Sequence, residues 1–144
     1  MTQAFHFGRR FAERGRGGIV LLSSVVGFHG APHFATYAAT KAYVQSLAEA
    51  LHVELAPHGI DVLALAPGPT KTGFAQRAGM QLDNAMSPEA VARATMKSLG
   101  SKSTVIPGFM SKLIAYGLAP APRWARIRLL GYVFHGRVKG QRPS

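Results

Sequence analysis

Tyr37 and Lys41 are the two side chains whose types and spacing best suit proton transfer. They lie four residues apart in the segment YAATK, so a helix would place them on one face. An ammonium group beside a phenol stabilises the phenolate and lowers the pKa of the phenol from about 10. A tyrosine in that environment can exchange a proton with an alcohol or carbonyl oxygen near neutral pH. The same spacing is also typical of an ordinary surface pair.

Ser24 is a second candidate, 13 residues before Tyr37 and directly after a short apolar run. In open α/β sheets, ligands bind beyond the carboxyl ends of the strands, so a serine there can hold a reacting oxygen by a hydrogen bond. Two alternatives remain open. The residue can simply close a strand into a loop, or Ser23 can be the functional serine, because a shift of one residue reverses the face of a strand.

The segment PGPTKT, at residues 67–72, follows a second apolar run and also lies at the carboxyl end of a predicted strand. Its prolines end the strand, its glycine leaves the backbone free to turn, and Thr70 and Thr72 supply hydroxyl groups. The alternative interpretation is a tight turn with capping hydroxyls.

Apolar runs and turn residues predict the elements that position these segments. Short apolar runs predict strands at residues 19–22, 60–66 and 104–106. Because the run at 19–22 is wholly apolar, we expect that strand to be covered on both faces. Helical patterns predict helices at residues 2–14, 37–55, 88–99, 109–118 and 123–134. Ser87 and Pro88 give the third of these a serine cap with proline at the first helical position.

This alternation of helices and strands predicts an α/β fold with a parallel sheet and right-handed crossovers. Three strands are few for such a sheet, and an open three-stranded half would leave an edge unpaired. We expect residues 1–107 to form the sheet domain and residues 108–144 to form a basic helical arm.

In the order GGIVLLSS, YAATK and PGPTKT, these segments resemble the short-chain dehydrogenase/reductase family, over the chain as far as about residue 106. The resemblance implies a partial Rossmann-like, doubly wound parallel sheet and NAD or NADP as cofactor. Tyr37 would be the general acid and base, Lys41 would lower its pKa and bind the nicotinamide ribose, and Ser24 would polarise the substrate oxygen. Hydride would pass directly between cofactor and substrate, without a metal. The residues lining the nicotinamide would be Pro67, Gly68, Thr70 and Thr72.

The resemblance covers only the C-terminal, catalytic half of that family. The sequence has no G-x-x-x-G-x-G turn for the cofactor pyrophosphate, and the glycines at residues 15–18 follow a predicted helix rather than a strand. The residue that selects NAD or NADP and the asparagine of the family's active site are also missing. We expect the coding DNA before Met1 to encode roughly 100–130 further residues, with that asparagine near their end.

By family the protein is expected to be an NAD(P)-dependent oxidoreductase, whereas the 144-residue chain alone is expected to be inactive. The alternative is a non-catalytic fragment that acts through its basic arm on a membrane or a partner.

Charge is distributed unevenly along the chain. The formal net charge is +11, with +1 over residues 1–89 and +10 over residues 90–144, where no Asp or Glu occurs. Such an arm can contact nucleic acid, anionic lipid or an acidic partner, or remain a solvated tail. We predict no nucleic-acid partner, and peripheral contact of residues 108–137 with anionic membranes. The side chains assigned to this contact are Phe109, Lys112, Leu113, Arg123, Trp124, Arg126, Ile127, Arg128, Leu130 and Phe134.

No apolar run is long enough to span a membrane, and the N-terminus does not resemble a secretory signal. With no cysteine, the sequence fits a reducing compartment, and we expect a cytoplasmic protein. The six histidines have few acidic neighbours in the sequence, so no metal site is expected.

The substrate is expected to be a hydrophobic alcohol or ketone, because apolar residues surround the candidate segments. His33 and Phe34, in the loop before Tyr37, are candidate substrate contacts. Residues after the PGPTKT segment are candidate pocket walls or core: Phe74, Met80, Leu82 and Met86. From the resemblance we expect the intact protein to be a homodimer that pairs the helices at 2–14 and 37–55.

Overall fold

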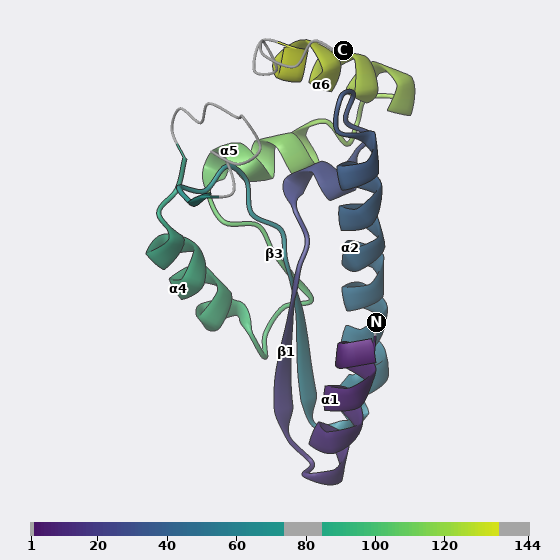
Figure 1. The fold of residues 1–144 in the computed structure, drawn as a ribbon, viewed down its shortest axis with the longest axis vertical. Coiled ribbons are helices and arrows are strands. Elements are labelled where there is room, and N and C mark those ends of the chain that lie inside the picture. The colour runs from purple at the N-terminus through teal and green to yellow at the C-terminus, as the bar shows by residue number, and fades with distance from the viewer. Residues whose placement is uncertain (1, 74–84, 136–144) are drawn as a thin grey trace.

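The computed structural model describes residues 2–73 and 85–135 (Figure 1). Its sheet has three parallel strands in the order β1-β2-β3, which confirms the predicted α/β class. β1 (Gly17–Leu22) pairs with β2 (Ile60–Leu65) along its whole length, from Gly17 opposite Ile60 to Leu22 opposite Leu65. β3 (Thr104–Val105) pairs only with the end of β2. The carboxyl ends of the strands therefore lie at one edge.

Helices cover the two faces of the sheet differently. α1 (Thr2–Glu13) and α2 (Ala35–Leu55) pack on one face, and α4 (Pro88–Ser98) lies on the other (Figure 1). α2 begins two residues before the predicted start. Short 3-10 turns, Val25–Phe28 and Ala56–His58, connect α2 to the strands before and after it. These elements agree closely with the predicted ones, because each has its own turn residues at its ends.

The core lies between β1, β2 and the two helices on their covered face. Its fully buried members include Ala48, Ile60 and Val62, and Phe11, Leu51 and Leu55 pack around them. Ala48 is completely buried, so α2 approaches the sheet at a position where a larger side chain would separate the two layers.

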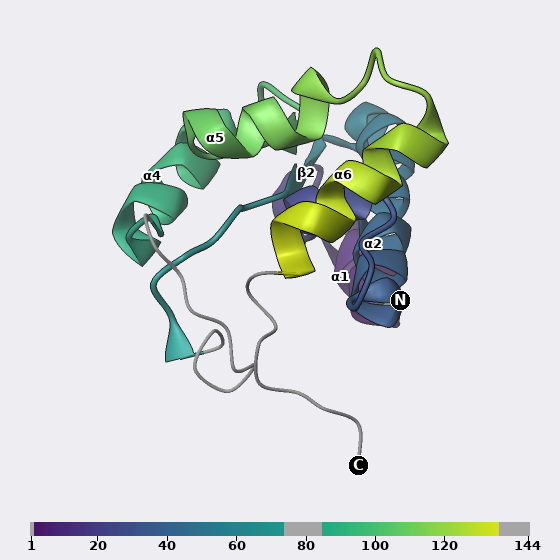
Figure 2. The same cartoon turned by 90° about the horizontal axis from the view of Figure 1, so that it is seen from above.

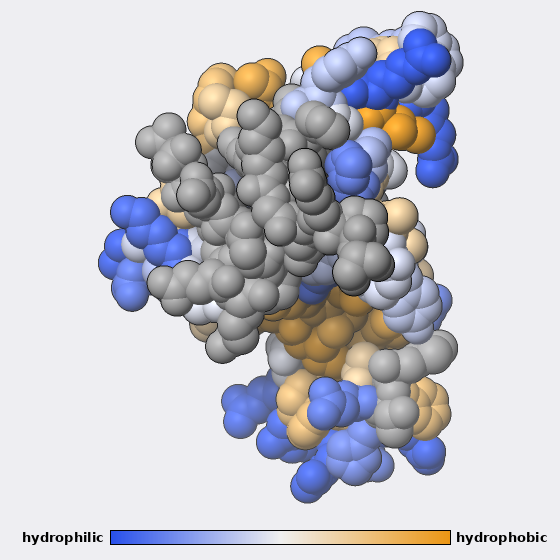
Figure 3. All heavy atoms as spheres, turned by 45° about the horizontal axis from the view of Figure 1, so that its top comes forward, coloured by the Kyte–Doolittle hydropathy of each residue, from blue (hydrophilic) through white to orange (hydrophobic). Residues whose placement is uncertain are grey.

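The opposite face of β1 is open, contrary to the prediction that this strand is covered on both faces. Val20 is 40% exposed and Leu22 is 55% exposed. Figure 3 shows a hydrophobic area on this side of the sheet. Within the described residues β1 pairs with β2 alone, so the expected unpaired edge is confirmed. β2, in contrast, is buried on both faces, since Val62, Leu63 and Ala64 are all inaccessible.

The C-terminal helices lie beyond the carboxyl edge of the sheet. α5 (Phe109–Lys112) continues as a π-helix (Leu113–Gly117), and α6 (Arg123–His135) follows after a turn. Figure 2 shows α4, α5 and α6 arranged around this end of the sheet. No helix in the described part of the chain has the length and apolar character needed to cross a membrane.

α6 is attached to the body of the protein through its inner face. Leu130 is buried in a cluster with Ala31 and Ala38. A side chain at Gly30 would lie 3.3 Å from Ile127, so loop and helix are in close contact there. The prediction that Ile127 and Leu130 belong to a membrane-facing surface is therefore wrong, because both side chains pack inward. The side chain of Phe134 lies outside the described residues.

The start of α4 provides a direct test of the predicted cap. Ser87 Oγ accepts a hydrogen bond of 3.2 Å from the Ala90 amide. We expect Ser87→Ala to lower the free energy of unfolding by about 1 kcal/mol, because that amide loses its acceptor. Chemical denaturation followed by circular dichroism measures the change. Ser46→Ala, on the exposed side of α2, is the control and should change stability by less than about 0.5 kcal/mol. Equal effects of the two substitutions would contradict the assigned cap.

Candidate active site

Tyr37 and Lys41 lie on one face of α2, as their spacing predicts. The Lys41 Nζ atom is 5.6 Å from the centroid of the Tyr37 ring. The same Nζ donates a 2.8 Å hydrogen bond to the Leu22 carbonyl oxygen at the end of β1. The ammonium group is therefore held between the last residue of a strand and the candidate acid/base.

Burial lowers the pKa of Lys41 below its usual value of 10.5, because desolvation disfavours the charged form. The side chain is half-buried. A charge that is partly withdrawn from water acts on its surroundings through a lower effective dielectric than a fully exposed charge.

The two adjacent serines have different partners. Ser23 is 1% exposed, and its Oγ donates a 2.9 Å hydrogen bond to the Lys41 carbonyl oxygen. Ser24 Oγ instead lies 3.5 Å from the Pro67 carbonyl oxygen, at the limit for a hydrogen bond. The hydroxyl of Ser23 thus fastens α2 to the sheet, whereas that of Ser24 is the more weakly bonded and faces the loop after β2.

The loop at residues 67–72 lies beside Ser24, and contacts from later parts of the chain hold it there. Thr70 Oγ1 donates a 3.1 Å hydrogen bond to the Gly68 carbonyl oxygen. Thr70 and Met86 form an isolated parallel bridge, in which the Lys71 amide donates to the Met86 carbonyl oxygen at 2.9 Å. Thr72 is exposed. The structure thus brings Ser24, Tyr37, Lys41 and this loop to the carboxyl edge of β1 and β2.

Gly27 and Ser111 are positioning residues in and around the site that were not found from the sequence. A Cβ at Gly27 would lie 2.9 Å from the Lys41 carbonyl group, so the turn after Ser24 packs directly on α2. A Cβ at Gly68 would lie 2.2 Å from Ser111 Oγ, so α5 contacts the loop at 67–72. Ser111 is buried but lies 43 residues from Gly68 in an unremarkable helical segment, and no local pattern distinguishes it.

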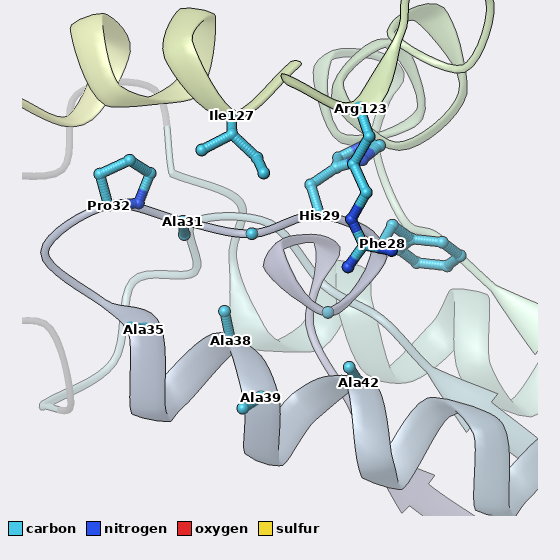
Figure 4. A pocket seen from close by; sticks show the side chains of 12 residues that line it. Phe28, His29, Ala31, Pro32, Ala35, Ala38, Ala39, Ala42, Arg123 and Ile127 are labelled. Atoms are coloured by element: carbon cyan, nitrogen blue, oxygen red, sulfur yellow. The ribbon is translucent and has the colours of Figure 1, made fainter. Parts of the chain in front are cut away.

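A hollow of about 390 Å³ lies between the loop at residues 27–32, α2 and α6 (Figure 4). Its floor is formed by alanines of α2, and Arg123 and Ile127 of α6 close it from above. None of Ser24, Tyr37 and Lys41 lines it. The lining alanines are Ala35, Ala38, Ala39 and Ala42. They occupy a different face of α2 from Tyr37 and Lys41, so this hollow is not the candidate catalytic site.

Residues expected to contact substrate have mixed outcomes. Met86 is described and belongs to the bridge with Thr70. Phe74, Met80 and Leu82 lie outside the described residues. His33 and Phe34 lie in the loop before α2, and their contact with substrate stays a prediction. His29 Nε2 is 3.0 Å from the Ile114 carbonyl oxygen and so links this loop to the π-helix. Within residues 2–73 and 85–135, no three His, Asp or Glu side chains gather to hold a metal ion.

Comparison with known proteins identifies the class to which this fold and site belong. The family model for short chain dehydrogenases matches residues 1–83, more than half of the chain. The chain therefore belongs to the short-chain dehydrogenase/reductase family.

Individual relatives extend the similarity beyond residue 83. The very-long-chain 3-oxoacyl-CoA reductase of Bos taurus is 30% identical over 120 residues, which is 83% of this chain and 38% of that protein. The 7β-hydroxysteroid dehydrogenase of Clostridium sardiniense is 32% identical over 111 residues, 74% of this chain and 42% of its own length.

Solved structures give the same result. A 7β-hydroxysteroid dehydrogenase has a TM-score of 0.76 at 28% identity, over 88% of this chain and 50% of that chain. A short chain dehydrogenase from Burkholderia cenocepacia, solved in complex with NADP, has a TM-score of 0.66 at 28% identity, over 80% and 47% of the two chains. The present chain thus spans half or less of these relatives.

The contact between Gly68 and Ser111 can be tested by a double-mutant cycle. Gly68→Ala should lower the free energy of unfolding by about 1–3 kcal/mol, because its Cβ would overlap Ser111 Oγ. In a Ser111→Ala background most of this loss should disappear, since the nearest remaining side-chain atom is Ser111 Cβ at 3.3 Å. Gly8→Ala, whose Cβ makes an ordinary 3.5 Å contact with Leu55, is the control and should be additive with Ser111→Ala. Additivity of the Gly68 and Ser111 substitutions would contradict the contact.

The lowered pKa of Lys41 predicts a pH dependence of stability. The unfolded chain binds a proton at residue 41 up to pH 10.5, whereas the folded chain releases it at lower pH. Folding is therefore disfavoured by this group at neutral pH, and the penalty decreases as the pH rises toward 10.5. We expect the free energy of unfolding of the wild type, relative to that of Lys41→Met, to increase over this range in urea titrations. A constant difference, or one that decreases, would show that burial does not shift this pKa.

Proposed function

We propose that this chain is the catalytic half of an NAD(P)-dependent oxidoreductase that interconverts an alcohol and a carbonyl compound. The observation that carries the proposal is the gathering of Ser24, Tyr37 and Lys41 at the carboxyl edge of the sheet, beside the loop at 67–72. Membership of the family and the NADP-bound relative support this choice of reaction and cofactor.

In this proposal Tyr37 and Ser24 act on the substrate hydroxyl or carbonyl group, and Lys41 acts on Tyr37. Tyr37 Oη removes the hydroxyl proton when an alcohol is oxidised and returns it when a carbonyl is reduced. The Lys41 ammonium stabilises the negative charge on the phenolate by Coulomb attraction. Ser24 Oγ donates a hydrogen bond to the substrate oxygen and so holds that oxygen in position for proton exchange with Tyr37.

The residues present fit the nicotinamide end of the cofactor. One Lys41 N–H is used by Leu22, which leaves two donors for ribose hydroxyls. Gly68 lacks the Cβ that would collide with Ser111, so α5 and the loop can form a continuous wall; Pro67, Thr70 and Thr72 complete the proposed contacts. When bound, the nicotinamide accepts hydride from the alcohol carbon or donates hydride to the carbonyl carbon.

The chain supplies no turn of the kind that binds the cofactor pyrophosphate. We therefore expect the isolated 144-residue protein to bind NADPH weakly and to show no turnover. Its substrate is a hydrophobic alcohol or ketone in this proposal, in line with the hydroxysteroid and very-long-chain 3-oxoacyl compounds for which two relatives are named. We place the enzyme in the cytoplasm, where a protein without cysteine loses nothing by reduction.

We also propose that the intact protein is a dimer that pairs α1 and α2. Phe5 on α1 and Tyr43 and Val53 on α2 are large apolar or aromatic side chains that stay exposed in the single chain. Such residues are typical of helix faces that pair with another subunit. A monomer in sedimentation of the completed enzyme would overturn this part of the proposal.

The role of Tyr37 can be tested in a chimaera that joins this chain to the cofactor-binding half of its NADP-bound relative. We expect NADPH-dependent reduction of hydrophobic ketones, and a decrease of about 10²–10⁴-fold in kcat for Tyr37→Phe. Tyr43→Phe is the matched control: Tyr43 lies on the same helix, is 52% exposed, and keeps as phenylalanine the aromatic ring proposed for the dimer face, so activity should stay within about twofold. Similar activities of the two variants would overturn the assignment of Tyr37.

A further inference from the structure

The outer side of the C-terminal helices carries aromatic side chains beside cations. On α6, residues 124, 128 and 132 are four apart and therefore form one stripe. Trp124 is 64% exposed and Tyr132 is 81% exposed, and the Arg128 guanidinium lies 5.7 Å from the centroid of the Trp124 ring. On α5 and the π-helix the exposed apolar residues are Phe109, Met110, Leu113 and Tyr116.

These exposed side chains are not the core face of either segment, because the inner faces are already packed. Leu130 of α6 is 2% exposed within its cluster, and Ser111 and Ala115 are buried under α5 and the π-helix. The two helical segments lie at the same end of the molecule (Figures 1 and 2). In Figure 3 hydrophobic atoms gather over α5, and hydrophilic and hydrophobic atoms lie together over α6.

The charge of this surface has one sign. No Asp or Glu occurs from residue 90 onward. Lys112, Arg123 and Arg128 are exposed, whereas Arg126 is turned back and donates to the Ala119 and Ala121 carbonyl oxygens. Neither the helices that carry these cations nor the rest of the chain after residue 90 supplies an Asp or Glu to pair with them. A negatively charged surface would complement their charge.

We propose that this C-terminal outer surface, formed by α5, the π-helix and α6, lies on membranes that contain anionic lipids. Trp124, Tyr132 and Phe109 would enter the headgroup region, where amphipathic aromatic rings are favoured. Lys112, Arg123 and Arg128 would contact lipid phosphates. Aliphatic residues such as Met110 and Leu113 favour lipid over nucleic acid, because phosphate backbones are bound mainly by cationic and polar groups.

Trp124 is the only tryptophan in the sequence, so its fluorescence reports directly on this surface. The purified chain is mixed with vesicles of phosphatidylcholine alone, or with about one third phosphatidylglycerol, at low and high salt. We expect sedimentation with the anionic vesicles at low salt only, because salt screens exposed charges. Trp124 emission should shift to shorter wavelength and be quenched by brominated acyl chains. Equal binding to both vesicles, or binding without any change in Trp124 emission, would overturn the proposal.

A matched pair of double variants separates this surface from the rest of the molecule. Trp124→Ser/Arg128→Glu should weaken binding to anionic vesicles at least about tenfold, because it removes an inserted ring and reverses a charge. Met96→Ser/Arg93→Glu on α4 is the control: Met96 is 68% exposed, Arg93 is an exposed cation three residues earlier, and the change in net charge is the same. We expect its binding to stay within about twofold of the wild type.

Equal losses in the two variants would show that net charge, not this surface, determines binding. Duplex DNA and inositol phosphates serve as soluble phosphate competitors. If either displaced the wild type from vesicles and bound it as tightly as the anionic vesicles do, the surface would be a general phosphate site and the membrane proposal would be wrong. Arg128→Glu alone keeps Trp124 and should still reduce both sedimentation and the emission shift.

Discussion

The structure of the candidate site depends on two hydrogen bonds that residue 41 exchanges with the end of β1. Lys41 Nζ donates to the Leu22 carbonyl oxygen, and Ser23 Oγ donates to the Lys41 carbonyl oxygen. Together they join the first turns of α2 to the last residues of a strand, with Gly27 packed on the same carbonyl group. Tyr37 is one helical turn away, so its position relative to Ser24 follows from this junction.

The junction lies on the side of the three-stranded sheet where the core is buried. The core under β1 and β2 is complete on the side of α1 and α2, where Ala48, Ile60 and Val62 are buried. The site residues are attached to this core by α2, which carries Tyr37 and Lys41, and by the loop that follows β2. The exposed face of Val20 and Leu22 lies across the sheet from this core. Covering it would add stability through burial of apolar surface.

Local sequence patterns predicted most of the elements and the shared helix face of Tyr37 and Lys41. The serine cap of α4 and the four-residue spacing of Tyr37 and Lys41 are properties of a few adjacent residues, and both have the predicted geometry. The open face of β1 could not be predicted. A wholly apolar run shows that both faces of a strand are suited to burial, but it does not show whether another element is present to cover each face. Nor could alternation predict the different hydrogen-bond partners of Ser23 and Ser24, since these depend on which hydroxyl the α2 backbone uses.

The contact of Ser111 with Gly68 could not be predicted for a related reason, because it joins segments that are distant in the sequence. α5 touches the loop at 67–72 with its inner face, while Phe109, Met110 and Lys112 point outward. One short helical segment thus supports the proposed nicotinamide wall on one side and forms part of the proposed membrane surface on the other. Because a buried contact cannot slide without losing packing, a surface that holds α5 also restrains the loop at Gly68. Membrane attachment through this segment would therefore place the carboxyl edge of the sheet, and with it Tyr37 and Ser24, close to the lipid surface in which a hydrophobic alcohol or ketone dissolves.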